Sequence, residues 1–252
     1  MTATLDALAV GPHPDDVELF CGGTIIRLVQ QGHRVGILDL TAGELASNGT
    51  VEARRAEANA AADVMGVVLR DNLGLPDGGL LPGTDNEQVR IAADAIRRLR
   101  PEVMFVPWLQ ARHPDHSAAG HLMRKATFMA GLSRYPTPSN APPHRPRLLF
   151  YQMRHRFTPS FLVDISTAIE TKLRAIQCHK SQIKPGPNGA ATLVASPGAM
   201  ASVEARDRYY GGFLGVEHAE PFKTEMTLGI EDPIRFFRDN AYTGAFAFED
   251  QS

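Results

Sequence analysis

Short apolar segments alternate with longer helical stretches along most of the chain, and this rhythm restricts the possible folds more than any other feature. The apolar segments predict strands at 5–10, 34–40, 102–107, 147–153 and 160–166. Helical periodicity, with end signals such as Gly32, Gly66 and Pro101, predicts helices at 21–31, 50–65, 87–99, 116–130, 167–179 and 202–212. Because such alternation is typical of parallel sheets, we expect an α/β fold with a mainly parallel sheet and helices on both faces.

Three segments rich in glycine and proline interrupt this rhythm and are predicted to be loops. They are 73–86, 135–147 and 181–199. We interpret 135–147 as a surface insertion without a function of its own. The chain has 252 residues with no internal repeat and no clear boundary, so we expect a single domain over 1–252.

Composition restricts the class of partner. The net charge of −2 lacks the basic excess of a nucleic-acid-binding protein, so we expect a small-molecule partner and no nucleic acid. No apolar run approaches the roughly 20 residues that span a bilayer, and the start, MTATLDALAV, lacks the basic residues of a signal peptide. Cys21 and Cys178 are too few for a disulfide framework, and we expect both to be reduced and buried. The sequence therefore predicts a cytoplasmic protein without membrane contact.

Two clusters of histidine and aspartate follow predicted strands. HPDD (13–16) comes after the first strand, and RHPDH (112–116) comes after the strand at 102–107. Ligands of open α/β sheets bind outside the carboxyl ends of the strands, so both clusters are expected at the same edge of the sheet. Two histidines and an aspartate are a ligand set of hydrolytic zinc sites, in which three protein ligands leave one position for water.

The spacing within HPDD indicates how its residues divide their roles. Pro14 keeps His13 extended, so that His13 and Asp16 can converge across the turn while Asp15 stays free for proton transfer. HPDD alone would fit a turn in which an aspartate caps the next helix. The second motif, HPDH, favours the metal site over this alternative.

These motifs, together with LGLPD, HKSQ and VEARDRYYGGFLGVEHAEPFK, resemble the LmbE/PIG-L family of zinc-dependent N-acetylglucosamine (GlcNAc) deacetylases. The resemblance covers nearly the whole chain and is greatest to the bacillithiol-biosynthesis branch, whose members remove acetyl from N-acetylglucosaminyl malate. It implies a Rossmann-like α/β fold, one Zn²⁺ per chain with other divalent metals possible, and a homo-oligomer, specifically a hexamer.

The resemblance also implies roles for individual residues. His13, Asp16 and His116 would bind zinc, Asp15 would be the general base, His113 would be a protonated imidazole facing the reacting carbonyl, and Asp115 would orient it. Arg112 and, less strongly, Arg54 are expected to contact an anionic group such as malate. A mobile-loop tyrosine of this branch has no counterpart, because 184–198 contains no tyrosine and Ala199 occupies the matching position.

Two alternatives remain open from the sequence. The enzyme could deacetylate other GlcNAc conjugates or chito-oligomers, or the chain could be a non-catalytic Rossmann-like module that binds a sugar or nucleotide. The absence of G-x-G-x-x-G weakens a dinucleotide-binding interpretation. Glu18 could serve the helix dipole or the site, whereas His121, His179 and His218 are expected to be structural or surface residues.

Overall fold

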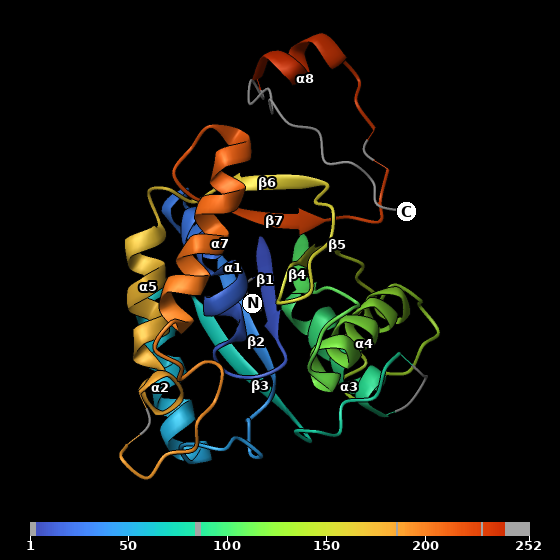
Figure 1. Cartoon of the computed structure of the whole chain (residues 1–252). Coiled ribbons are helices and arrows are strands. Elements are labelled where there is room, and N and C mark those ends of the chain that lie inside the picture. The colour runs from blue at the N-terminus through green and yellow to red at the C-terminus, as the bar shows by residue number, and fades with distance from the viewer. Residues whose placement is uncertain (1–3, 84–86, 185, 228, 240–252) are drawn as a thin grey trace.

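A computed structural model describes residues 4–83, 87–184, 186–227 and 229–239, and its strands form one mixed sheet between two helical layers (Figure 1). The strands are β1 (Ala7–Gly11), β2 (Val35–Thr41), β3 (Leu69–Leu75), β4 (Val103–Pro107), β5 (Arg147–Tyr151), β6 (Phe161–Asp164) and β7 (Ala219–Lys223). The helices are α1 (Asp16–Gln30), α2 (Val51–Met65), α3 (Glu87–Leu99), α4 (Pro114–Ala130), α5 (Ile169–Cys178), α6 (Lys180–Ile183), α7 (Ala199–Leu214) and α8 (Pro233–Asp239).

The sheet has the order β3-β2-β1-β4-β5-β7-β6, and its first five strands run parallel. Only β7 pairs antiparallel, with β5 on one side and β6 on the other. The predicted mainly parallel α/β fold is therefore confirmed. The predicted single domain includes residues outside the described ranges and stays a prediction.

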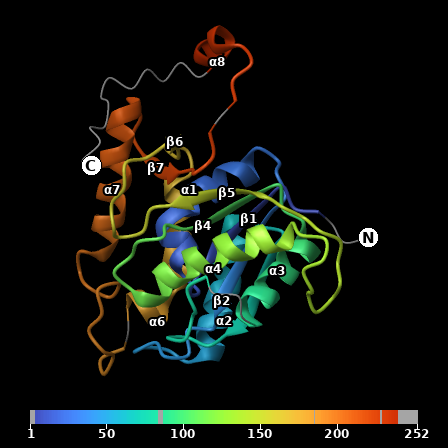
Figure 2. The ribbon, with the colours of Figure 1, turned by 90° about the vertical axis from the view of Figure 1, so that its right-hand side faces the viewer.

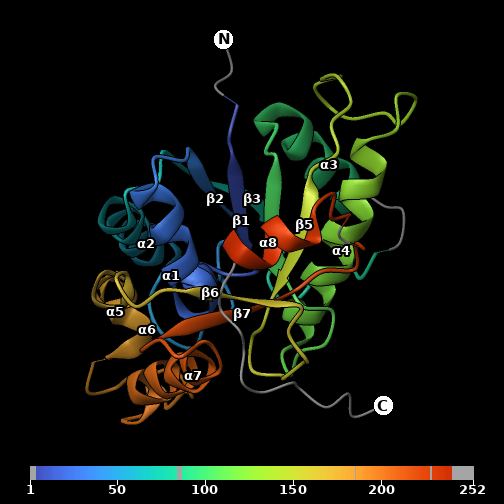
Figure 3. The same ribbon diagram turned by 90° about the horizontal axis from the view of Figure 1, so that it is seen from above.

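Side chains of the central strands alternate between two hydrophobic cores, one on each face of the sheet. Ala7 and Ala9 of β1 point into the core beneath α1, α2, α5 and α7, whereas Leu8 and Val10 point into the core beneath α3 and α4. Figure 3 shows the two groups of helices on opposite sides of the strands. Because both faces are covered, β1 is apolar without interruption, and the same holds for much of β2.

Two strands were not predicted from the sequence. β3 is an edge strand with mostly half-buried or exposed side chains, so its sequence LRDNLGL lacks an apolar run, and its last residues lie in the predicted loop 73–86. That loop also contains 84–86, which lie outside the described residues. β7 has the sequence AEPFK, in which a proline and a buried glutamate mask the strand signal. The short helix α6 likewise lies within the predicted loop 181–199, apart from its first residue.

Both histidine–aspartate motifs lie at the starts of helices. These helices begin earlier in the chain than the sequence predicted. α1 begins at Asp16 rather than at 21, and α4 begins at Pro114 rather than at 116. Proline suits the first position of a helix, and the His113 side chain caps α4 by accepting a hydrogen bond from the Asp115 amide. The motifs therefore form the turns that join each strand to its helix.

The two cysteines differ in how far they are buried. Cys21 is buried, but Cys178 at the end of α5 is only half-buried, so the expectation that both cysteines are buried was wrong for Cys178. Both are free thiols.

Across the described helices, none combines the length and the apolar character that crossing a bilayer requires.

A fully buried charge network connects α1, α5, α7 and β7. Lys172 Nζ lies 2.5 Å from Asp207 Oδ2 and 2.7 Å from Glu220 Oε1. Glu220 also accepts hydrogen bonds from the Gly23 and Thr24 amides and from the Thr24 hydroxyl. Arg206 Nη2 lies 2.6 Å from Asp207 Oδ1, so that two cations compensate the two carboxylates in the protein interior.

Replacing Lys172 by methionine is expected to lower the free energy of unfolding by about 3 kcal/mol, because Asp207 and Glu220 would lose their shared cation inside the core. Urea unfolding followed by circular dichroism measures the change. Arg174→Met, an exposed arginine on the same helix, is the matched control and is expected to change stability little. A Lys172→Met protein as stable as the wild type would contradict this role.

Candidate active site

The motif residues gather at the carboxyl edge of the parallel strands, around a pocket of about 570 Å³. His13, Asp15 and Asp16 follow β1, and Arg112, His113 and His116 follow β4. Since β1 and β4 are parallel neighbours, their carboxyl ends deliver both motifs to one place.

The structure brings the three predicted metal ligands together. Asp16 Oδ2 lies 3.2 Å from His13 Nδ1 and 3.3 Å from His116 Nε2. One ligand atom from each residue lies within 4.8 Å of those of the other two. The Asp16 carboxylate also accepts a hydrogen bond from the His13 amide at 3.0 Å, which fixes it across the turn.

Further carboxylates surround His13 on its other side. His13 Nε2 lies 3.0 Å from Asp77 Oδ1 and 3.5 Å from Asp115 Oδ2. Burial by itself lowers the pKa of His13, but the hydrogen bonds that its protonated ring donates to Asp115, Asp16 and Asp77 outweigh burial and raise the pKa to about 12. This part of the pocket therefore strongly favours positive charge.

The carboxylate of Asp16 is held in its ionised form. Burial alone would raise its pKa, but His116 and His13 outweigh burial and lower the pKa below the usual range of an aspartate. An ionised oxygen flanked by two imidazoles, in a pocket that favours positive charge, fits a divalent cation such as Zn²⁺.

Asp15 is buried in an uncommon backbone conformation, with φ 130°. A non-glycine residue in this region carries strain, so contacts must hold the turn in place. Burial raises the pKa of the Asp15 carboxyl to about 6, and the positive charge of Arg54 opposes this rise. A carboxylate with a pKa near neutrality suits a group that takes up and releases a proton.

Arg54, expected to contact substrate, lies buried beside the Asp15 turn. Its guanidinium donates hydrogen bonds to the Pro14 carbonyl at 2.7 Å and the Gly43 carbonyl at 3.2 Å, and lies 3.5 Å from Asp15 Oδ1. Gly43 has φ +67°, and a Cβ there would lie 1.9 Å from Arg54 Nη1. Glycine at this position therefore permits the close approach of Arg54.

His113 and Asp115 make contacts that differ from the expected pair. His113 Nδ1 accepts a hydrogen bond from the Asp115 amide at 3.2 Å. The Asp115 carboxylate accepts one from the Gly78 amide at 2.7 Å and lies beside His13. Burial, together with His116 and His13, lowers the pKa of His113. The protonated imidazole expected from the resemblance stays a prediction. In its neutral form, a ring whose Nδ1 accepts this hydrogen bond carries its hydrogen on Nε2.

The sequence of this chain is similar to a known protein family and to a characterised deacetylase. The PIG-L family, described as GlcNAc-PI de-N-acetylase, matches residues 8–127. A diacetylchitobiose deacetylase of Thermococcus kodakarensis is 34% identical over 188 residues, which are 69% of this chain and 69% of that protein. The chain belongs to the PIG-L family. The family and this relative make it an enzyme, an N-deacetylase, and set aside the non-catalytic alternative.

Two further proteins are similar to this PIG-L enzyme over much of their length. The solved structure of the conserved protein TT1542 from Thermus thermophilus has a TM-score of 0.81 and 43% identity, covering 90% of this chain and 98% of that one. A probable N-acetyl-alpha-D-glucosaminyl L-malate deacetylase 2 of Bacillus cereus is 30% identical over 191 residues, which are 69% of this chain and 82% of that protein. The bacillithiol branch named by the sequence resemblance thus stays a prediction.

Two charged residues that line the PIG-L enzyme's pocket were not predicted from the sequence. Asp77 follows β3, and Arg154 follows β5, at the same carboxyl edge as the two motifs. Arg112, which was predicted, lines the pocket as an exposed guanidinium, as does Arg154. Partial burial and the charge of Arg112 lower the pKa of Arg154, so two cations share this side of the pocket.

The loop that follows α6 closes another side of the pocket. Ala191, Thr192, Leu193 and Val194 line it, and these residues come from the predicted loop 181–199. Ala199, at the position of the branch's mobile-loop tyrosine, is instead the first residue of α7.

Glu18 lies beneath the site rather than in the pocket. It is fully buried, forms an ion pair with Arg70, and lies 3.1 Å from His179 Nε2. Asp39 accepts hydrogen bonds from the same Arg70. His179 and His218 are buried outside the pocket lining, and His121 is half-buried, in keeping with structural or surface roles.

Proposed function

We propose that this enzyme is a zinc-dependent hydrolase that removes the N-acetyl group from a GlcNAc conjugate, with N-acetylglucosaminyl malate as its preferred substrate. The observation that carries the proposal is the arrangement of His13, Asp16 and His116 beside the buried carboxylate of Asp15. The names of the deacetylase relatives support a GlcNAc-type substrate.

His13, Asp16 and His116 would hold the Zn²⁺, because two imidazole nitrogens and a carboxylate oxygen are ligands that zinc prefers. When bound, the metal would acidify a water and polarise the amide carbonyl. Asp77 and Asp115 lie beside His13 and would orient its ring, as carboxylates commonly do for metal-binding histidines.

Asp15 would act as the general base. It would accept a proton from the attacking water as the oxygen bonds to the acetyl carbon, and return that proton to nitrogen as the C–N bond breaks. The products are acetate and a free amine. Arg54 would keep Asp15 in place through the Pro14 and Gly43 carbonyls, so we propose a positioning role for Arg54 instead of a substrate contact.

His113 would stabilise the carbonyl oxygen as it gains negative charge. With Nδ1 occupied by the Asp115 amide, the hydrogen on Nε2 is available to donate, and this donor does not require the ring to be protonated. His113 lines the pocket, where a reacting carbonyl would bind.

Arg112 and Arg154 would bind the carboxylates of malate. Arginine suits planar anions because its guanidinium donates paired hydrogen bonds. These two cations share the pocket with the proposed metal site, so a substrate with a negatively charged aglycone would gain contacts that free GlcNAc lacks.

Arg112→Ala is expected to lower kcat/KM for N-acetylglucosaminyl malate by about 10- to 100-fold, which corresponds to about 1.5–3 kcal/mol for a lost charged hydrogen bond. Free GlcNAc and diacetylchitobiose carry no such anion, so their slower deacetylation should change much less. Arg154→Ala should behave in the same way. The measurement is acetate release from each substrate.

Arg156→Ala is the matched control, because Arg156 lies two residues from Arg154 but stacks on Tyr209 and is not among the residues that line the pocket. An equal loss of kcat/KM on charged and neutral substrates would contradict a specific contact with malate. The enzyme would then be a general GlcNAc deacetylase.

A further inference from the structure

The motif HKSQ (179–182) spans the start of α6, and its last residue, Gln182, lines the active-site pocket. Figure 2 shows α6 beside α2, the helix that also carries Arg54. Gln182 is half-buried and uncharged, and none of the roles proposed above involves it. It is therefore a polar residue of the pocket that the proposed reaction does not yet use.

The contacts of Gln182 fix which end of its amide is the nitrogen. Nε2 lies 2.8 Å from the Asn48 carbonyl oxygen and 3.0 Å from Ser181 Oγ. The carbonyl can only accept, and Ser181 Oγ already donates its one hydrogen to Glu57 Oε2 at 2.7 Å, so both oxygens must accept from Gln182. Both amide hydrogens are thus used. Among the described residues, no donor bonds to Oε1, which is left as an acceptor.

The partners of this amide are themselves held in place. Glu57 of α2 accepts a second hydrogen bond from the Ser181 amide at 2.7 Å. The Asn48 side chain pairs with the backbone of Ala190, donating to its carbonyl at 3.0 Å and accepting from its amide at 2.8 Å. These bonds connect α2 with the two loops that border the pocket. Gln182 therefore has the fixed orientation that selection between similar substrates requires.

We propose that Gln182 Oε1 accepts a hydrogen bond from a hydroxyl of the substrate sugar and so selects substrates that carry this hydroxyl. The inference rests on the proposed function, because it requires a sugar in the pocket. An acceptor that loses its donor inside a protein site costs free energy, so an analogue without the hydroxyl should react more slowly. Gln182 cannot compensate by donating to another group, since both of its amide hydrogens are used.

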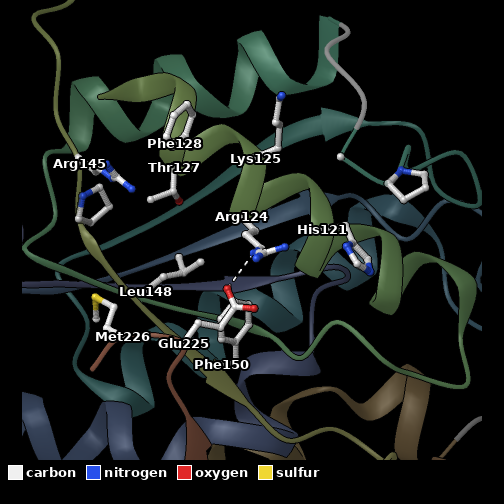
Figure 4. A pocket seen from close by; sticks show the side chains of 13 residues that line it. His121, Arg124, Lys125, Thr127, Phe128, Arg145, Leu148, Phe150, Glu225 and Met226 are labelled. Atoms are coloured by element: carbon white, nitrogen blue, oxygen red, sulfur yellow. Dashed lines mark hydrogen bonds and ion pairs between the residues drawn. The ribbon is translucent and has the colours of Figure 1, made fainter. Parts of the chain in front are cut away.

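A second cavity, of about 630 Å³, lies between α4 and β5 and is a poorer place for a neutral sugar (Figure 4). None of the described residues that line it also lines the active-site pocket. Its charged side chains include Arg124, Lys125 and Arg145, which only donate hydrogen bonds. Glu225, its one carboxylate among the described residues, lies 2.8 Å from Arg124, as the dashed line shows. Hydroxyl donors are therefore better matched by the active-site pocket.

Substrate analogues that each lack one hydroxyl test the contact. N-acetylglucosaminyl malate is compared with its 3-, 4- and 6-deoxy analogues, and acetate release gives kcat/KM for the wild type and for Gln182→Met, which removes the acceptor but keeps the length of the side chain. At one position the wild type should lose about tenfold or more, and Gln182→Met should process that analogue as fast as the parent. The corresponding fluoro analogue should be as poor for the wild type, because fluorine cannot donate a hydrogen bond.

This coupling between enzyme and substrate distinguishes a contact from a general disturbance of the pocket, which would slow all substrates alike. Gln182→Ala is a second variant that removes the same acceptor, and zinc content and circular dichroism are matched to the wild type. Gln177→Met, at an exposed glutamine of α5, is the control and should show the wild-type pattern.

Two results would overturn the contact while leaving the deacetylase intact. They are a wild type that tolerates the loss of every hydroxyl, and a penalty that persists in both Gln182→Met and Gln182→Ala. A zinc-loaded wild type that releases no acetate from the parent substrate would instead overturn the proposed function, and with it the contact that depends on it.

Discussion

Replacing both His13 and His116 by alanine is expected to remove the bound zinc and to lower deacetylation by about a thousandfold or more. Only Asp16 would remain of the proposed ligand set, and a single carboxylate in a partly open pocket cannot retain zinc at neutral pH. Metal content after dialysis is measured by mass spectrometry, and acetate release is measured on the same preparation. Each single variant should show the same effects to a smaller or equal degree.

His33→Ala controls for the loss of a histidine as such. His33 is exposed, lies near Asp6 and belongs to neither motif, so this variant should keep its zinc and its activity. Stoichiometric zinc in the His13→Ala/His116→Ala protein would show that the ligands are elsewhere. Full activity without bound zinc would remove the metal from the mechanism.

Asp15→Asn is expected to keep the metal and to lower kcat by about a hundredfold or more, because an amide cannot accept the proton of the attacking water. The substitution preserves the size of the side chain, and asparagine tolerates positive φ better than most residues, so the strained turn should persist. Loss of activity should therefore occur without loss of zinc or of thermal stability.

Comparing kcat of the wild type and of Asp15→Asn at equal zinc content distinguishes a residue that acts as the base from one that binds the metal. Asp63→Asn, on the exposed side of α2, makes the same chemical change away from the site and should leave kcat unchanged. Near-normal turnover of a zinc-loaded Asp15→Asn enzyme would require another residue to be the base.

The fold and the proposed ligand set could be anticipated because the relevant signals are local. HPDD and HPDH each follow an apolar strand, and parallel strands place their carboxyl ends at one edge whatever their order in the sheet. Asp77 was missed because β3, the strand before it, is a polar edge strand that leaves no apolar run. Arg154 follows β5 without any spacing that distinguishes it from Arg156.

The roles proposed for Arg54 and His113 depend on contacts that no spacing reveals. An arginine near the start of a helix has the same sequence signature whether it meets solvent, substrate or backbone carbonyls. Only the close approach of Gly43 and Pro14 shows that Arg54 supports the Asp15 turn. Similarly, HPDH is compatible with a His113–Asp115 carboxylate pair, but the start of α4 directs the Asp115 amide to His113 and its carboxylate to His13.

Metal-dependent acetate release tests the central claim most directly. Purified wild-type enzyme is stripped with a chelator and returned to zinc in steps, and acetate and free amine are measured from N-acetylglucosaminyl malate and from diacetylchitobiose. We expect no turnover of the stripped enzyme, recovery that saturates at one zinc per chain, equal amounts of the two products, and faster turnover of the malate conjugate. An undiminished rate after stripping, or no acetate from either substrate with one zinc bound, would contradict this expectation.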